Sequence, residues 1–78
     1  MKLQDLGNYR NCKLTLIDYE DGTGEIQANI EDPFSAYHLE DPSKAILNAH
    51  INPAVWTMDL KTLEHSDQFA KVKLERVR

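Results

Sequence analysis

The stretch DYEDGTGE, from Asp18 to Glu25, carries the most chemistry in the chain, because it holds four carboxylates and two glycines in eight positions. Such a cluster is typical of calcium loops, phosphate-binding turns or tight hairpins. An EF-hand loop has an oxygen ligand at position five, glycine at six and glutamate at twelve. Counted from Asp18, those positions hold Gly22, Thr23 and Asn29. No calcium site is therefore expected.

A phosphate-binding loop is also excluded. The Gly-Thr-Gly of this stretch lacks the additional glycine and the lysine of such loops, and the neighbouring carboxylates would repel a phosphate. The remaining interpretation is a hairpin turn of about four residues, in which Asp21-Gly22 and Gly24 supply backbone positions with positive φ. The sequence thus predicts an unusually acidic turn.

Residues suited to metal binding or nucleophilic catalysis are widely spaced. Structural zinc favours closely spaced ligand pairs, whereas the candidates here, Cys12, His38, His50 and His65, stand far apart. No serine or cysteine lies in a known nucleophile motif, and Cys12 is expected to be a small buried apolar residue. We therefore expect no catalytic residue, no metal and no cofactor, and the protein is predicted not to be an enzyme.

Four segments alternate between apolar and polar residues, as half-buried strands do. Residues 12–19 and 25–31 meet across the acidic turn, and residues 54–62 and 69–77 form a second hairpin that turns through residues 64–68. The apolar sides expected to face the core are Cys12, Leu14, Leu16, Ile26, Ala28, Ile30, Trp56, Met58, Leu60, Ala70, Val72 and Leu74.

A helix is predicted over residues 42–51. Asp41 is a suitable N-cap, Pro42 fits the first helical position, and Pro53 disfavours continuation. The order hairpin, helix, hairpin predicts an α+β fold with an antiparallel sheet of about four strands and the helix on one face. The alternative is a small five-stranded barrel with residues 34–39 as the extra strand.

The whole chain, residues 1–78, is predicted to be one small domain, since 78 residues suffice for a single core. The first residues, with Leu3, Leu6 and Tyr9, are expected to form a short capping turn. One cysteine excludes an intramolecular disulfide and favours a reducing compartment. The N-terminus lacks a signal-peptide pattern, and no apolar run approaches the length of a membrane span. The expectation is a soluble, cytoplasmic protein without membrane contact.

Charge is distributed unevenly within the net charge of −4. Residues 18–41 contain eight carboxylates and no lysine or arginine, whereas the last ten residues hold two lysines and two arginines against one glutamate. The long acidic segment should create a negative potential over one side of the molecule, which suits a basic partner. The candidate partner-binding residues are Asp18, Tyr19, Glu20, Asp21, Glu25, Glu31, Asp32, Tyr37 and Glu40.

In size, acidity and lack of catalytic motifs, the chain resembles as a class the small inhibitors that bacteriophages encode against host defence, including anti-CRISPR proteins and DNA mimics, and the bacterial immunity proteins. That resemblance implies an inhibitor or adaptor. We expect it to dock an acidic face on a basic, nucleic-acid-binding protein, without binding nucleic acid directly; a homodimer is compatible with the sequence. The alternative is a small barrel-like subunit that binds nucleic acid, or assembles with other subunits, through the basic C-terminal strand.

Overall fold

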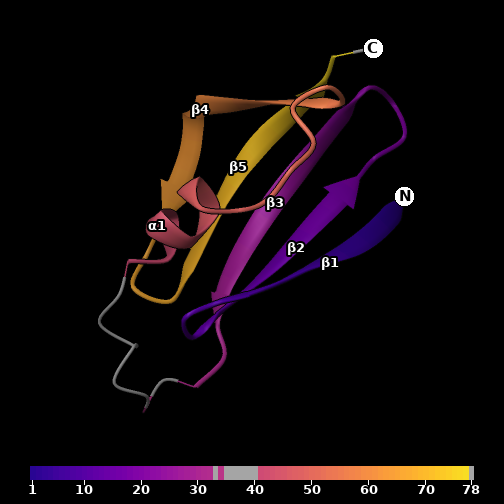
Figure 1. Ribbon diagram of the computed structural model, residues 1–78. Helices are drawn as coiled ribbons and strands as arrows, with labels where there is room; N and C mark the ends of the chain where they lie inside the picture. The colour runs from indigo at the N-terminus through magenta and orange to yellow at the C-terminus, as the bar shows by residue number, and fades with distance from the viewer. Residues whose placement is uncertain (33, 35–40, 78) are drawn as a thin grey trace.

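The chain forms a five-stranded antiparallel sheet with one short helix on one face (Figure 1). The structure is a computed structural model that describes residues 1–32, 34 and 41–77. The strands lie side by side in the order β1-β2-β3-β5-β4. The elements are β1 (Lys2–Tyr9), β2 (Cys12–Asp18), β3 (Thr23–Ile30), α1 (Pro42–Leu47), β4 (Trp56–His65) and β5 (Phe69–Arg76).

The predicted α+β class and both hairpins are confirmed, but the sheet has five strands rather than about four. The fifth is β1, in the segment expected to be only a capping turn. Its backbone pairs with β2 from Lys2↔Asp18 to Tyr9↔Cys12. Most of its side chains are exposed. Because little of the strand is buried, its sequence does not show the apolar alternation of a half-buried strand. Backbone pairing with β2 decides its conformation.

The sheet is open rather than a closed barrel, because β1 and β4 form its two edges. The barrel alternative is therefore wrong for the described residues. Its proposed extra strand, residues 34–39, lies outside the described residues except for Phe34. The chain passes from β3 through α1 to β4, and β5 then fills the place between β3 and β4.

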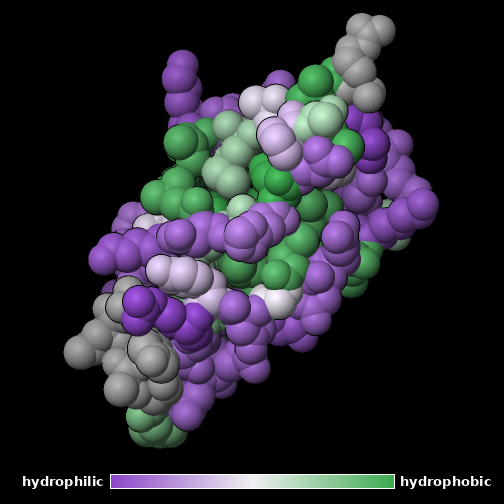
Figure 2. All heavy atoms as spheres, viewed as in Figure 1, coloured by the Kyte–Doolittle hydropathy of each residue, from purple (hydrophilic) through white to green (hydrophobic). Residues whose placement is uncertain are grey.

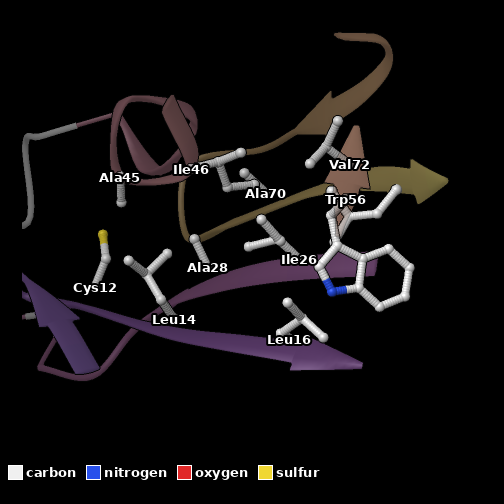
Figure 3. Packing of buried hydrophobic residues seen from close by; sticks show 11 residues of the cluster. Cys12, Leu14, Leu16, Ile26, Ala28, Ala45, Ile46, Trp56, Ala70 and Val72 are labelled. Atoms are coloured by element: carbon white, nitrogen blue, oxygen red, sulfur yellow. The ribbon is translucent and has the colours of Figure 1, made fainter. Parts of the chain in front are cut away.

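The core lies between the sheet and α1, as the alternation predicted. Side chains expected to face inward on β2, β3 and β5 are at most 4% exposed, with Ile30 partly buried. The pair Ala28↔Ala70 lies in the two central strands, and their small side chains leave room for Ile46 of α1 (Figure 3). In the same view Ala45 points toward Cys12, which is buried as expected.

Helix α1 begins where predicted and ends four residues early. Asp41 Oδ1 accepts from the Ser43 N–H at 2.9 Å, and Pro42 occupies the first turn. The helix stops because Asn48 caps it: its side-chain Nδ2 donates to the Lys44 carbonyl at 2.8 Å. The chain after Asn48 runs across the sheet toward β4, and Figure 2 shows hydrophobic surface between it and α1.

Strand β4 starts at Trp56 and bends sharply near its middle (Figure 1). Its pairing with β5 passes from Asp59↔Lys73 to Glu64↔Lys71, so four residues of β4 stand opposite one residue of β5. This bulge breaks the alternation, which is why Leu60 is 54% exposed rather than in the core as predicted. Met58, before the bulge, is only partly buried.

Candidate protein-binding site

The β2–β3 hairpin ends in the acidic loop, residues 19–22, and this loop with Asp18 is here named the acidic end. The predicted four-residue turn is confirmed. The Tyr19 N–H donates to the Thr23 carbonyl at 3.1 Å, and the Arg76 N–H donates to the Gly22 carbonyl at 2.9 Å. Glu20 and Gly22 carry the positive φ values, 62° and 92°. The loop is thus tied to β5 as well as to its own hairpin.

Gly24 has a different role from the one predicted. Its φ is not positive; instead the residue is buried beneath Trp56. A Cβ placed there would lie 2.8 Å from the Ile17 carbonyl oxygen and 3.1 Å from two ring carbons of Trp56. Close packing therefore requires a glycine at this position. The local sequence cannot distinguish a glycine needed for packing from one needed for a turn.

Two carboxylates of the acidic end form ion pairs within the molecule. Arg76 Nη2 donates to Asp18 Oδ2 at 2.6 Å, while the guanidinium carbon lies 4.6 Å from the centroid of the Trp56 ring. Glu20 Oε2 accepts from the Met1 ammonium at 2.8 Å, and Lys2 Nζ lies 3.8 Å from Glu20 Oε1. Much of the local negative charge is therefore balanced by cations distant in the sequence.

Local hydrogen bonds and charges lower the pKa values of two loop carboxylates below their usual range. The hydrogen bond from the Met1 ammonium, with its charge, lowers the pKa of Glu20. The Thr23 hydroxyl and backbone N–H both donate to Asp21 Oδ1, at 2.5 and 3.0 Å, and they lower the pKa of Asp21. Asp18 Oδ1 accepts from the Glu20 N–H at 2.8 Å, which fixes the loop further.

The structure does not gather all predicted site residues on one face. Asp18 pairs with Gly24 on the helix side of the sheet, whereas Glu25 pairs with Ile17 and Lys73 on the opposite side. Asp18 and Glu20 do not share one strand face either, because β2 ends at Asp18 and Glu20 lies in the loop.

Glu31 and Asp32 lie beyond the other end of β3. Seven steps of an extended chain, roughly 23 Å, separate the ends of that strand. There Asn11 holds Asp32, donating through Nδ2 to its carbonyl and accepting from its N–H at 3.2 Å. Tyr37 and Glu40 lie outside the described residues.

The C-terminal basic cluster is also divided. Arg76 is ion-paired with Asp18 of the acidic end, while Lys71 and Lys73 lie on the sheet face opposite α1, level with Gln27 and Glu25. Sequence reasoning missed the contribution of Arg76, Met1 and Lys2 because strand order, not sequence separation, brings them to the loop. The pairs Lys2↔Asp18 and Trp56↔Arg76 place them there.

Residues 1–32, 34 and 41–77 contain no group of three or more histidine, cysteine or acidic side chains arranged to hold a metal ion. Within the same residues no helix has the length and apolar character needed to cross a membrane.

Comparisons with protein-family models, with curated proteins and with solved structures found no match to this chain. The function is therefore inferred from the residues themselves.

Proposed function

We propose that the protein is a small non-catalytic binding module that docks its acidic end on a basic protein surface. The observation that carries the proposal is the setting of Tyr19. Tyr19 is 40% exposed, and in the sequence it stands between the ion-paired Asp18 and the loop carboxylates Glu20 and Asp21. Tyrosine is among the residues that dominate binding energy at interfaces, because it buries a large rigid surface and keeps a polar tip.

The rigidity of the loop supports this role. Backbone hydrogen bonds at Tyr19 and Gly22, together with side-chain bonds from Asp18 and Asp21, hold the loop in one conformation. A partner then has little loop entropy to remove on binding, and ordering such segments is a large part of what association costs.

The internal ion pair of Glu20 is compatible with docking. Glu20 and Lys2 are exposed, with side-chain exposures of 47% and 77%, and exposed ion pairs contribute little to stability. Lysine or arginine side chains of a partner would replace these internal cations. The pair of Asp18 and Arg76 is more enclosed and belongs to the scaffold, so Asp18 would act through the loop shape rather than by direct contact.

The partner best suited to this end is a protein whose basic surface normally holds nucleic acid, since lysine and arginine are clustered on such surfaces. Docking there would make the protein an inhibitor or adaptor of the anti-defence or immunity type. Charge attraction would mainly accelerate encounter, while Tyr19 would supply the desolvated anchor.

Site-specific photocrosslinking tests this proposal. With p-benzoylphenylalanine in place of Tyr19, we expect a small set of basic proteins from a bacterial lysate to be captured, and added DNA should compete with the capture. The same amino acid at His50, exposed in the segment that follows α1, is the matched control and should capture none of them. Equal capture at both positions, or capture unaffected by DNA, would contradict the proposal.

A further inference from the structure

The two edges of the sheet are protected to different degrees. Edge strands expose unpaired backbone N–H and C=O groups, which proteins usually protect with bulges, prolines or short length. Strand β4 has its large bulge near the middle, whereas β1 keeps a regular register with β2 from Lys2 to Asp5 before its own bulge. Among the described residues, no strand pairs with the outer side of β1 (Figure 1). This regular segment is open to pairing with another strand.

Hydrogen bonds at the two ends of β2 show which of its residues bond β1. Along an antiparallel strand, successive residues direct their N–H and C=O groups alternately toward the two neighbouring strands. The Glu31 N–H donates to the Asn11 carbonyl at 2.9 Å, and the Tyr19 N–H donates to the Thr23 carbonyl at 3.1 Å. The register between β2 and β3 is regular, so odd-numbered residues of β2 bond β3. The even-numbered residues of β2 therefore bond β1.

The same alternation identifies the outward backbone groups of β1. Lys2 and Gln4 stand opposite even-numbered residues of β2, so their N–H and C=O groups bond β2. The groups of Leu3 and Asp5 consequently point away from the sheet. They form a short row of donors and acceptors at which an antiparallel strand can add.

Leu3 makes this edge apolar on one face. The residue is 65% exposed and stands opposite Ile17, which is itself opposite Glu25 on the sheet face away from α1. Side chains directly opposite each other on neighbouring strands are close enough to pack. In the isolated chain, Leu3 has such a neighbour on one side only. A strand added to β1 would supply the second neighbour.

Self-pairing of β1 allows few registers. Two copies related by a twofold axis can pair antiparallel only with one residue opposite its own counterpart, because opposed side chains must share a face. Lys2 or Asp5 on the axis would oppose two like charges, which is destabilising. Gln4 on the axis would set Leu3 opposite Asp5. Leu3 on the axis brings two exposed leucines together and opposes no like charges.

We propose that β1 pairs antiparallel with β1 of a second copy of this chain, with Leu3 on the twofold axis. The two Leu3 residues exchange backbone hydrogen bonds, and the Asp5 N–H donates to the Met1 carbonyl of the second copy. The Leu3 side chains and the flanking Ile17 side chains form one apolar row across the junction. The two sheets become continuous. Because the contact is small, the dimer is weak and depends on concentration.

Sedimentation equilibrium at rising protein concentration measures this association. We expect a monomer–dimer equilibrium. Leu3→Lys sets two ammonium groups opposite each other in place of two leucines and should weaken dimerisation about tenfold or more. Leu47→Lys, at a leucine of α1 that is 57% exposed, is the matched control and should leave it unchanged. The amide NMR spectra of both variants show directly whether each remains folded.

Amide hydrogen exchange tests the backbone pairing. The Gln4 N–H should be protected at every concentration because it bonds β2, whereas the Leu3 and Asp5 N–H groups should gain protection only as the dimer forms. A chain that stays monomeric, or exchange at Leu3 and Asp5 that does not change with concentration, would overturn the proposal. Equal weakening by Leu47→Lys would do the same. Stronger association of Leu3→Lys would place Leu3 opposite Asp5 and contradict the register. None of these results depends on docking through the acidic end.

Discussion

At the scale of single residues, two glycines near the same turn are required for different physical reasons. Gly22 has a φ of 92°, and nothing lies within 4 Å of a Cβ placed there, whereas Gly24 lies against Ile17 and Trp56. The first is needed for its backbone conformation and the second for its lack of a side chain. Substitutions at the two positions should therefore separate backbone strain from steric crowding.

We expect Gly24→Ala to lower the free energy of unfolding by about 1–3 kcal/mol, the usual effect of overpacking, as measured by urea denaturation. Gly22→Ala should lower it by about 1–2 kcal/mol through backbone strain alone, since nothing lies within 4 Å of the added Cβ, and Gly22→Asn should lower it less because asparagine tolerates left-handed backbone better. If Gly24→Ala were as stable as the native protein, the packing of Trp56 described above would be wrong.

Residue types alone identified the inward positions of β2, β3 and β5 and the acidic turn, because alternation and turn chemistry are local properties. They could not identify the partners of that turn. Arg76 stands 58 positions from Asp18, and only the strand order brings the two together. The acidic turn inferred from the sequence is consequently, in the folded protein, a partly balanced ionic cluster next to Tyr19.

At the scale of elements, α1 shows how a local signal fixes one end of a helix and not the other. Asp41 and Pro42 define its start, as the sequence predicted. Its end is set by Asn48, whose side chain bonds the Lys44 carbonyl, before Pro53 is reached. A six-residue helix has little intrinsic stability, so it depends on the burial of Ala45 and Ile46 and on its cap.

Asp41→Ala should lower the free energy of unfolding by about 1 kcal/mol, whereas Asp41→Asn should keep most of it, because asparagine is an equally good N-cap. Thermal or urea denaturation measures both. Equal losses in the two variants would show that the charge of Asp41 matters rather than its hydrogen bond to Ser43.

The same cap predicts a pH dependence. Hydrogen bonds from Ser43 lower the pKa of Asp41 in the folded protein. The cap's contribution is therefore fully present above the unfolded pKa of about 4 and is lost as the pH falls through the lower, folded value. The stability difference between the native protein and Asp41→Ala should shrink below about pH 4. A difference that stayed constant to pH 2 would contradict this linkage.

Like strand β1, the bulge of β4 was not predicted from the sequence. The apolar alternation was assumed to continue through Leu60, whereas the strand bulges between Asp59 and Glu64. Thr62→Val should lower the free energy of unfolding by about 1 kcal/mol, since it leaves the Lys73 N–H without its acceptor. Thr62→Ser retains the hydroxyl and should lose less. Equal stability of Thr62→Val and the native protein would mean that this bond does not support the bulge.

At the scale of the whole molecule, the fold separates three chemical regions that the sequence mixes. The acidic end lies at one end of the β2–β3 hairpin, Glu31 and Asp32 lie at the other, and the mixed charges of Glu25, Lys71 and Lys73 lie on the face opposite α1. The acidic residues are thus a localised end rather than a continuous face. A partner that recognises charge would meet that end in one orientation.

The most direct test of the proposed docking is the association rate of the captured partner as ionic strength rises. Glu20→Gln with Asp21→Asn removes two charges from the acidic end; Glu64→Gln with Asp67→Asn removes two exposed charges elsewhere. At low salt the first pair should slow association about tenfold or more, the second should have little effect, and the difference should fade as salt screens the charges. Equal rates for both pairs at every salt concentration would contradict docking through the acidic end.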